Sequence, residues 1–190
     1  GKGRAGDVDL LRSIGQTSGF GVTAVEAVTH DNGIVYSSTA IRQALRDGRP
    51  QDATHLLGRP WEIAGIVAHG DARGRTIRFP TANVALGNHL RPKFGVYAIE
   101  LGLISQDDGQ TVERWVRGVA NIGVRPSFGG DNDAGLEAHL FDFDQDIYDR
   151  PVRVRLHGFI RGEKKFDGLD ALKAQIASDV VAAKEILGKI

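Results

Sequence analysis

Five apolar runs of strand length follow one another from residue 59 onward, and no helical pattern lies between them. Clusters of Gly, Pro, Asn and Asp separate the runs, as turn residues separate strands. Repeated strands without intervening helices predict an antiparallel sandwich or a closed barrel rather than a parallel sheet. The runs are residues 63–68, 96–103, 112–119, 136–143 and 152–160.

A single helix is expected after the last strand. Asp167 is the expected N-cap, and Leu169, Leu172, Ile176 and Val180 form an apolar stripe at i, i+3, i+7 and i+11 spacing. The pattern predicts that this helix packs on the barrel and closes it off.

Residues 1–58 have a different pattern, typical of a partial α/β segment. Asn32-Gly33 is a turn signal, and β-branched residues alternate before it as in a strand. Capping residues and helix-terminating glycines mark three helices. The expected elements are a helix from Asp7 to Gly15, a strand over 20–28, a helix from Ser37 or Ser38 to Gly48, and a helix from Pro50 to Leu57.

The amino-acid composition excludes several kinds of partner and of functional site. The 190 residues include 24 Lys+Arg and 24 Asp+Glu, so no basic field favours nucleic acid or a membrane surface as a partner. No apolar run approaches the roughly 20 residues that cross a bilayer. Cysteine is absent, which excludes disulfides, thiolate nucleophiles and Cys-ligated zinc. We expect a cytoplasmic protein with small-molecule substrates, and the lack of methionine indicates a piece of a longer product.

The segment PTAN, residues 80–83, interrupts an apolar sequence with polar side chains. Thr81 and Asn83 are spaced by two, so their oxygens lie on one side of an extended backbone. Two neutral oxygens suit a magnesium ion that also binds phosphate oxygens and water. Before them, Gly70 and Gly74 would allow backbone to approach a ligand closely, and Arg75 adds charge. The alternative is a surface loop with an Asx turn.

The run LEAHLFDF, residues 136–143, alternates strictly, so Glu137, His139, Phe141 and Phe143 are expected on one face. A carboxylate beside aromatic rings is suited to act as a general base. A cross-strand ion pair is the other reading of Glu137.

The run FIRGEKKF, residues 159–166, places Arg161, Lys164 and Lys165 between two phenylalanines. Aromatic faces and an arginine can hold a flat heterocycle. A solvated strand end before a helix has the same composition, so both interpretations stay open.

Taken together, these stretches resemble the riboflavin kinase module of bacterial bifunctional FAD synthetases. Residues 1–58 are similar to the tail of the FMN adenylyltransferase module of that family, through GKGRAGD and SST-x-IR. The resemblance covers about residues 59–190. In chain order its motifs are PTAN, GVYA (95–98), NIG-x-RP-x-F (121–128), LE-x-HL-x-DF (136–143) and IR-x-E-x-KF (160–166).

The resemblance implies a six-stranded antiparallel Greek-key barrel with a C-terminal helix, over residues 59–190, and an adenylyltransferase remnant over 1–58. It also implies roles for individual residues. Glu137 would be the catalytic base, Thr81 and Asn83 would bind Mg²⁺, Gly70, Gly74, Arg75 and Thr81 would bind the nucleotide, and Asn83, Arg161 and Phe166 would lie on the flavin side.

The implied activity is an ATP-dependent riboflavin kinase that yields FMN and ADP. The parent protein would also adenylylate FMN to FAD, but the H-x-G-H element of that activity is absent, so this chain is not expected to make FAD alone. A non-catalytic flavin-binding barrel is the alternative. Zero net charge disfavours a nucleic-acid-binding barrel.

Overall fold

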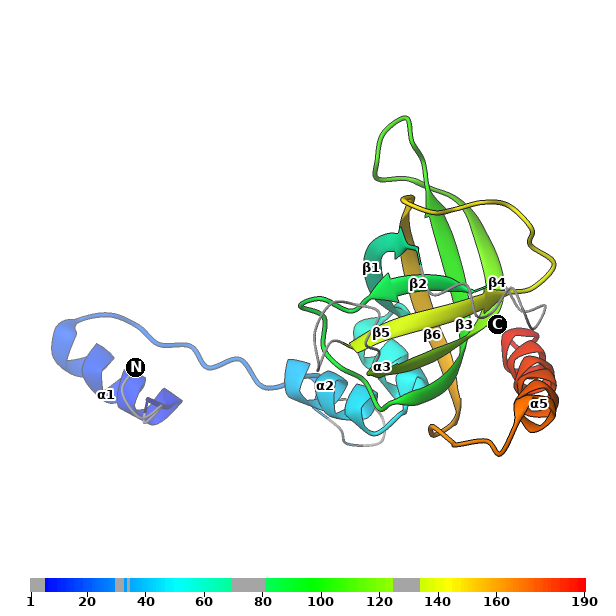
Figure 1. The fold of residues 1–190 in the computed structure, drawn as a ribbon. Helices are drawn as coiled ribbons and strands as arrows, with labels where there is room; N and C mark the ends of the chain where they lie inside the picture. The colour runs from blue at the N-terminus through cyan, green and yellow to red at the C-terminus, as the bar shows by residue number, and fades with distance from the viewer. Residues whose placement is uncertain (1–5, 30–32, 34, 70–80, 125–133) are drawn as a thin grey trace. The chain divides into compact units, whose positions relative to one another are not determined.

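The computed structural model of the chain describes residues 6–29, 33, 35–69, 81–124 and 134–190 (Figure 1). These form two compact units, Gly1–Tyr36 and Ser37–Ile190. The second unit contains the barrel and the helices α2, α3 and α5. It is described first because it carries the predicted site.

The barrel is closed and has six strands, in the order β1-β2-β5-β4-β3-β6, and all neighbouring strands are antiparallel (Figure 1). Because β2 pairs with β5 rather than with β3, the connectivity is of the Greek-key type. The predicted fold class is therefore confirmed. The strands are β1 (Trp61–Ala68), β2 (Ala82–Ala85), β3 (Gly95–Ile104), β4 (Val112–Val124), β5 (Ala134–Leu140) and β6 (Pro151–Arg161).

Alternating apolar side chains from all six strands fill the barrel interior. Tyr97 is the largest fully buried side chain there, and its hydroxyl donates a hydrogen bond to the carbonyl of Lys93 at 2.5 Å. That burial raises the pKa of Tyr97. The fully buried residues at the centre include Ile63, Val67, Val84, Tyr97, Ile99, Leu101, Ile122, Leu136 and Leu156.

The helix α5 (Leu169–Leu187) covers the outer face of β3 and β4 (Figure 1). Two details differ from the sequence prediction. The N-cap is Gly168, without a side-chain hydrogen bond, rather than Asp167, and the buried line runs through Asp179, Ala183 and Leu187 rather than through Leu169, which is 50% exposed. Within the described part of the chain, no helix has both the length and the apolar character that crossing a membrane requires.

The helices α2 (Ser38–Arg46) and α3 (Pro50–Leu57) form as predicted. Ser37 caps α2 by accepting a hydrogen bond from the backbone N–H of Ala40, and Pro50 occupies the first turn of α3. Their small core of Ala44, Leu45 and Ala53 packs against Trp61 of β1 and Leu90. These two helices therefore belong to the barrel unit.

The first unit contains α1 (Val8–Ser18), capped by Asp7, whose carboxylate accepts a hydrogen bond from the N–H of Leu10 at 2.8 Å. The helix passes the predicted end at Gly15 and stops at Gly19, which has a φ of 80°. Helices commonly end at a glycine in the left-handed conformation, and Gly19 adopts it.

The strand predicted over residues 20–28 is not formed. In the described part of this unit, the only β pairing is an isolated bridge between Thr29 and Val35. Val25 and Val28 are 90% and 70% exposed. Alternating β-branched residues make a strand only where a neighbouring strand accepts their hydrogen bonds, and the described residues supply none over this stretch.

Candidate active site

A row of directly opposite residues crosses all six strands and begins at Ala68 on β1, which lies opposite Asn83. Asn83 on β2 lies opposite Glu137 on β5, and Glu137 lies opposite Asn121 on β4. The row continues through Val96 on β3 to Arg161 on β6. Three residues predicted for the site, Asn83, Glu137 and Arg161, therefore share one line across the sheet although up to 78 positions separate them in the sequence.

This row faces outward from the barrel. The sequence neighbours of Asn83, Glu137 and Asn121 all belong to the interior core, and side chains alternate between the two faces of a strand. Asn83 is only 6% exposed, whereas Glu137 and Asn121 are half-buried. The outer face here thus carries a carboxylate flanked on both sides by amide side chains.

The predicted aromatic neighbours of Glu137 are only partly in place. The strand β5 ends at Leu140, and Asp142 has a φ of 51°, which turns the chain. Phe141 packs with the cluster under α5, with its ring centroid 6.3 Å from that of His139. Phe143 instead packs against the interior core. The expectation that Phe143 shares the face of Glu137 is wrong, because the alternation ends with the strand.

Thr81 lies just before β2 and lines a cavity with a volume of about 220 Å³. Val67, Leu140 and Ile147 supply apolar wall, and Asp144 adds a carboxylate. The other lining residues are Ala82, Ala138, Phe143, Gln145, Asp146 and Tyr148. A concave apolar space with a few polar groups is typical of a site for a small organic ligand.

The loop between β5 and β6 forms much of this cavity, and the sequence analysis gave it no role. The ring of Tyr148 stacks on His69 with 4.1 Å between centroids, and Nε2 of His69 lies 3.5 Å from Oδ2 of Asp149. Asp146 accepts a hydrogen bond from the N–H of Tyr148. The available signal was the sequence FDFDQDIYD, where closely spaced Asp residues indicate side-chain-stabilised turns.

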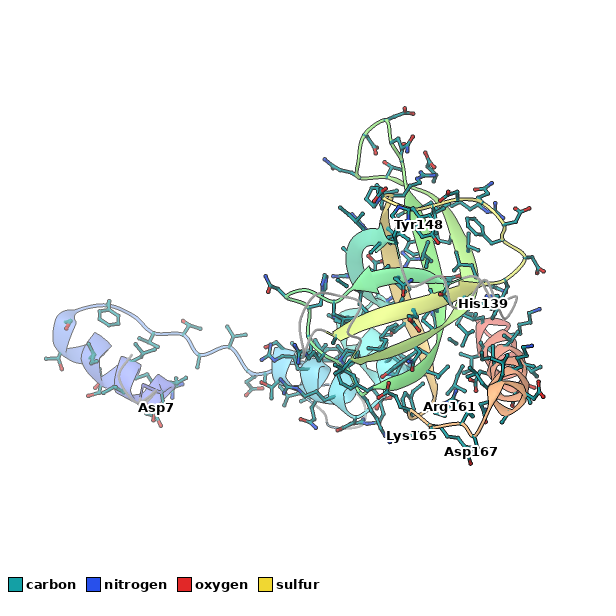
Figure 2. The ribbon with its side chains drawn as sticks, viewed as in Figure 1. Asp7, His139, Tyr148, Arg161, Lys165 and Asp167 are labelled. Atoms are coloured by element: carbon teal, nitrogen blue, oxygen red, sulfur yellow. The ribbon has the colours of Figure 1, made fainter. Side chains whose placement is uncertain are left out.

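Arg161 is held by α5. Its Nε and Nη2 donate to both oxygens of Asp179 at 2.7 to 3.1 Å, and Gln175 donates to Oδ1 of the same carboxylate (Figure 2 shows Arg161 at the end of β6). The guanidinium carbon lies 5.7 Å from the ring centroid of Phe166. Arg161 and Phe166, both predicted for the flavin side, are therefore adjacent, and Arg161 has a fixed orientation.

Three predicted nucleotide-binding residues, Gly70, Gly74 and Arg75, lie outside the described residues. Among those that are described, no cluster of three His, Asp or Glu side chains could hold a metal ion. Thr81 and Asn83 offer neutral oxygens instead. That donor set suits Mg²⁺, which commonly takes few protein ligands and completes its shell with water and substrate phosphates.

The comparisons with known proteins show the family of the chain. The riboflavin kinase (flavokinase) family model matches residues 57–187. Proteins named bifunctional riboflavin kinase/FMN adenylyltransferase are 47% identical in Escherichia coli K12, over 99% of this chain and 57% of that protein, and 45% identical in Pseudomonas fluorescens, over 96% and 56%. The chain thus spans little more than half the length of these relatives.

A crystal structure titled as a macrolide-efflux protein from Streptococcus pneumoniae matches with a TM-score of 0.72 and 36% identity, over 90% of this chain and 53% of that chain. It supports the fold. The resemblance drawn from the five motifs is confirmed by the family model and by the relatives. The chain belongs to the riboflavin kinase family.

Proposed function

We propose that this chain transfers the γ-phosphoryl group of ATP to the 5′-hydroxyl of riboflavin, which gives FMN and ADP. The observation that carries the proposal is the pairing of Asn83 with Glu137 on adjacent strands of a barrel that belongs to this family. The pairing puts a candidate metal ligand and a candidate base within one strand spacing, about 4.8 Å between backbones. Phosphoryl transfer depends on such positioning and on charge neutralisation.

The nucleotide half of the site consists of Thr81 and Asn83. These two residues would hold Mg²⁺, which neutralises phosphate charge when it is bound. The cavity beside Thr81 lies among residues of the interior core, on the opposite face of β2 from Asn83. Gly70, Gly74 and Arg75 would enclose the phosphates, as the family resemblance implies.

The acceptor half contains Glu137, Arg161 and Phe166. Glu137 orients the 5′-hydroxyl of riboflavin and takes its proton as the oxygen bonds to the γ-phosphorus, while the bond from that phosphorus to the bridging oxygen breaks and ADP leaves. Arg161, held by Asp179, and Phe166 provide a rigid edge for the flat flavin ring.

We also propose that residues 1–58 derive from the adenylyltransferase module of a longer bifunctional protein, and that residues 59–190 form the kinase module. The relatives named for both activities, which are longer than this chain, support the assignment. Because ATP is the phosphoryl donor, the cytoplasm is the expected compartment.

The test is incubation of the chain with riboflavin, ATP and Mg²⁺, followed by separation of FMN and FAD. We expect FMN without FAD, no product when EDTA removes Mg²⁺, and recovery when Mg²⁺ is restored. A protein that binds FMN but shows no turnover would instead be the flavin-binding barrel of the alternative interpretation. FAD formed from FMN and ATP would contradict the assignment of residues 1–58.

A further inference from the structure

The part of the outward row that solvent can reach is short. Asn83 and Val96 are 6% and 5% exposed, and Val96 is covered by the cluster under α5. Glu137 and Asn121, which lie between them, are both half-buried and face the same side. Of the two side chains directly across from Glu137, Asn121 is therefore the more accessible one.

The next outward-facing row consists of two glycines and an alanine. Gly123 on β4 lies opposite Gly135 on β5, and Ala85 on β2 lies opposite the same Gly135. Gly123 and Gly135 are buried, and the carboxylate of Glu163 lies over Gly123, where a Cβ would come within 2.2 Å of its Oε1. A ligand at Glu137 therefore meets Asn121 rather than this covered row.

We propose that Asn121 binds the polyhydroxyl side chain of the flavin substrate. The proposal rests on the proposed function, because it takes the terminal hydroxyl of that chain to be at Glu137. Hydroxyls on the preceding carbons then lie beside Asn121. Its amide can both donate and accept a hydrogen bond, which matches a row of alcohols, each of which also does both. Asn121 thereby selects flavins that carry a polyol chain.

The experiment compares two flavins by fluorescence titration without ATP: riboflavin, and lumiflavin, which has the same ring but no hydroxyl chain. Asn121→Ala is expected to weaken riboflavin binding about three- to tenfold, the effect of one neutral hydrogen bond, and to leave lumiflavin binding unchanged. Asn121→Ser keeps a hydroxyl and should lie between the two. Asn88→Ala, at an exposed turn position, is the matched control and should bind both flavins as the unmodified chain does.

Two results would overturn the proposal: riboflavin binding unchanged in Asn121→Ala, or equal losses for both flavins, which would indicate a structural role. If Asn121→Ala does not fold, Asn121→Ser decides by the same comparison. Since the titration needs no turnover, a failure of Asn121 to bind the polyol chain and a failure of the chain to make FMN are observed separately.

Discussion

At the scale of single residues, the main feature is that Glu137 on β5 lies between Asn83 on β2 and Asn121 on β4. Both neighbours are amides, which are polar but carry no charge. Glu137 is therefore the charged residue among Asn83, Glu137 and Asn121. In the proposed reaction this carboxylate is the proton acceptor.

The variant Glu137→Gln should retain flavin binding and lose turnover. Glutamine preserves the shape of the side chain but cannot accept a proton, and removal of a general base typically costs about 10²–10⁴-fold in rate. The measurement is kcat for FMN formation together with a flavin titration. Glu113→Gln, a half-exposed carboxylate on β4 that pairs with Arg150, is the control and should keep its rate. An unchanged kcat in Glu137→Gln would reject the base assignment.

His157 gives a second prediction at this scale. Its side chain is 10% exposed, and Nε2 lies 3.0 Å from Oε2 of Glu100. Burial lowers the pKa of His157, although Glu100 acts in the opposite direction. The unfolded chain then binds this proton more readily than the folded one, so stability present above about pH 6.5 is lost as the pH falls below that value.

The check is urea unfolding of the protein and of His157→Gln at pH 7.5, 6.5 and 5.5. The free energy of unfolding should fall more steeply with acidification in the unmodified protein than in the variant. Both proteins share the same carboxylates, so parallel slopes would show that His157 does not contribute.

At the scale of elements, the ion pair between Arg161 and Asp179 joins α5 to the last strand. Asp179 is 4% exposed and accepts from both Arg161 and Gln175, so two side chains on two elements depend on one carboxylate. Because Arg161 also ends the outward row, the helix that packs on the barrel also sets the orientation of a predicted flavin residue.

Asp179→Ala should lower the free energy of unfolding by about 3 kcal/mol, at the lower end for a broken buried pair because Arg161 keeps 22% of its side chain exposed. Glu185→Ala, exposed on the same helix, is the control and should change stability by no more than about 0.5 kcal/mol. Equal effects of the two substitutions in urea unfolding would mean that the pair does not hold α5 in place.

The elements that the sequence predicted well are those with local signals. Ser37 predicts the start of α2 as a capping residue, and Pro50 predicts the start of α3 as a first-turn residue. The apolar runs of the barrel alternate with a period of two. The failures have non-local causes. Residues 20–28 alternate but have no strand to pair with, and Leu169 begins an apolar stripe whose first turn extends beyond the covered sheet. Both outcomes depend on partners that are distant in the sequence.

For the site, too, local sequence signals predicted single residues, whereas the arrangement of these residues depends on partners distant in the sequence. The motifs identified Asn83, Glu137 and Arg161 individually, but their common row depends on the strand order, which periodicity does not determine. Asn121 was part of a quoted motif and received no role, because its position opposite Glu137 appears only once β4 and β5 are paired. Thr81 was expected at phosphates, and the cavity beside it is formed by a loop more than 60 residues later.

At the scale of the whole molecule, the compact unit that includes the barrel begins at Ser37, before α2 and α3. Trp61 of the first strand packs against the core of these helices, so they complete the barrel unit on that side. The described residues of the outward row and of the cavity beside Thr81 belong to the unit Ser37–Ile190.

We therefore expect residues 37–190 to fold and to form FMN at the rate of the full chain. Residues 59–190 should be less stable by about 2 kcal/mol, the free energy of burying one large apolar side chain, because Trp61 and Leu90 lose their cover. Urea unfolding of the two shortened chains and their kcat values provide the measurement. If residues 59–190 matched 37–190 in stability, α2 and α3 would not be part of the kinase unit.

Closure of the barrel has a consequence for any longer protein that carries it. A closed ladder leaves no strand edge to which a preceding module could add its own strands. The strands that carry Asn83, Glu137 and Asn121 therefore cannot be extended by a sheet that precedes them in the same polypeptide. A partner module can approach only through side chains and helices, so two reactions could be joined in one chain while the geometry of each is maintained separately.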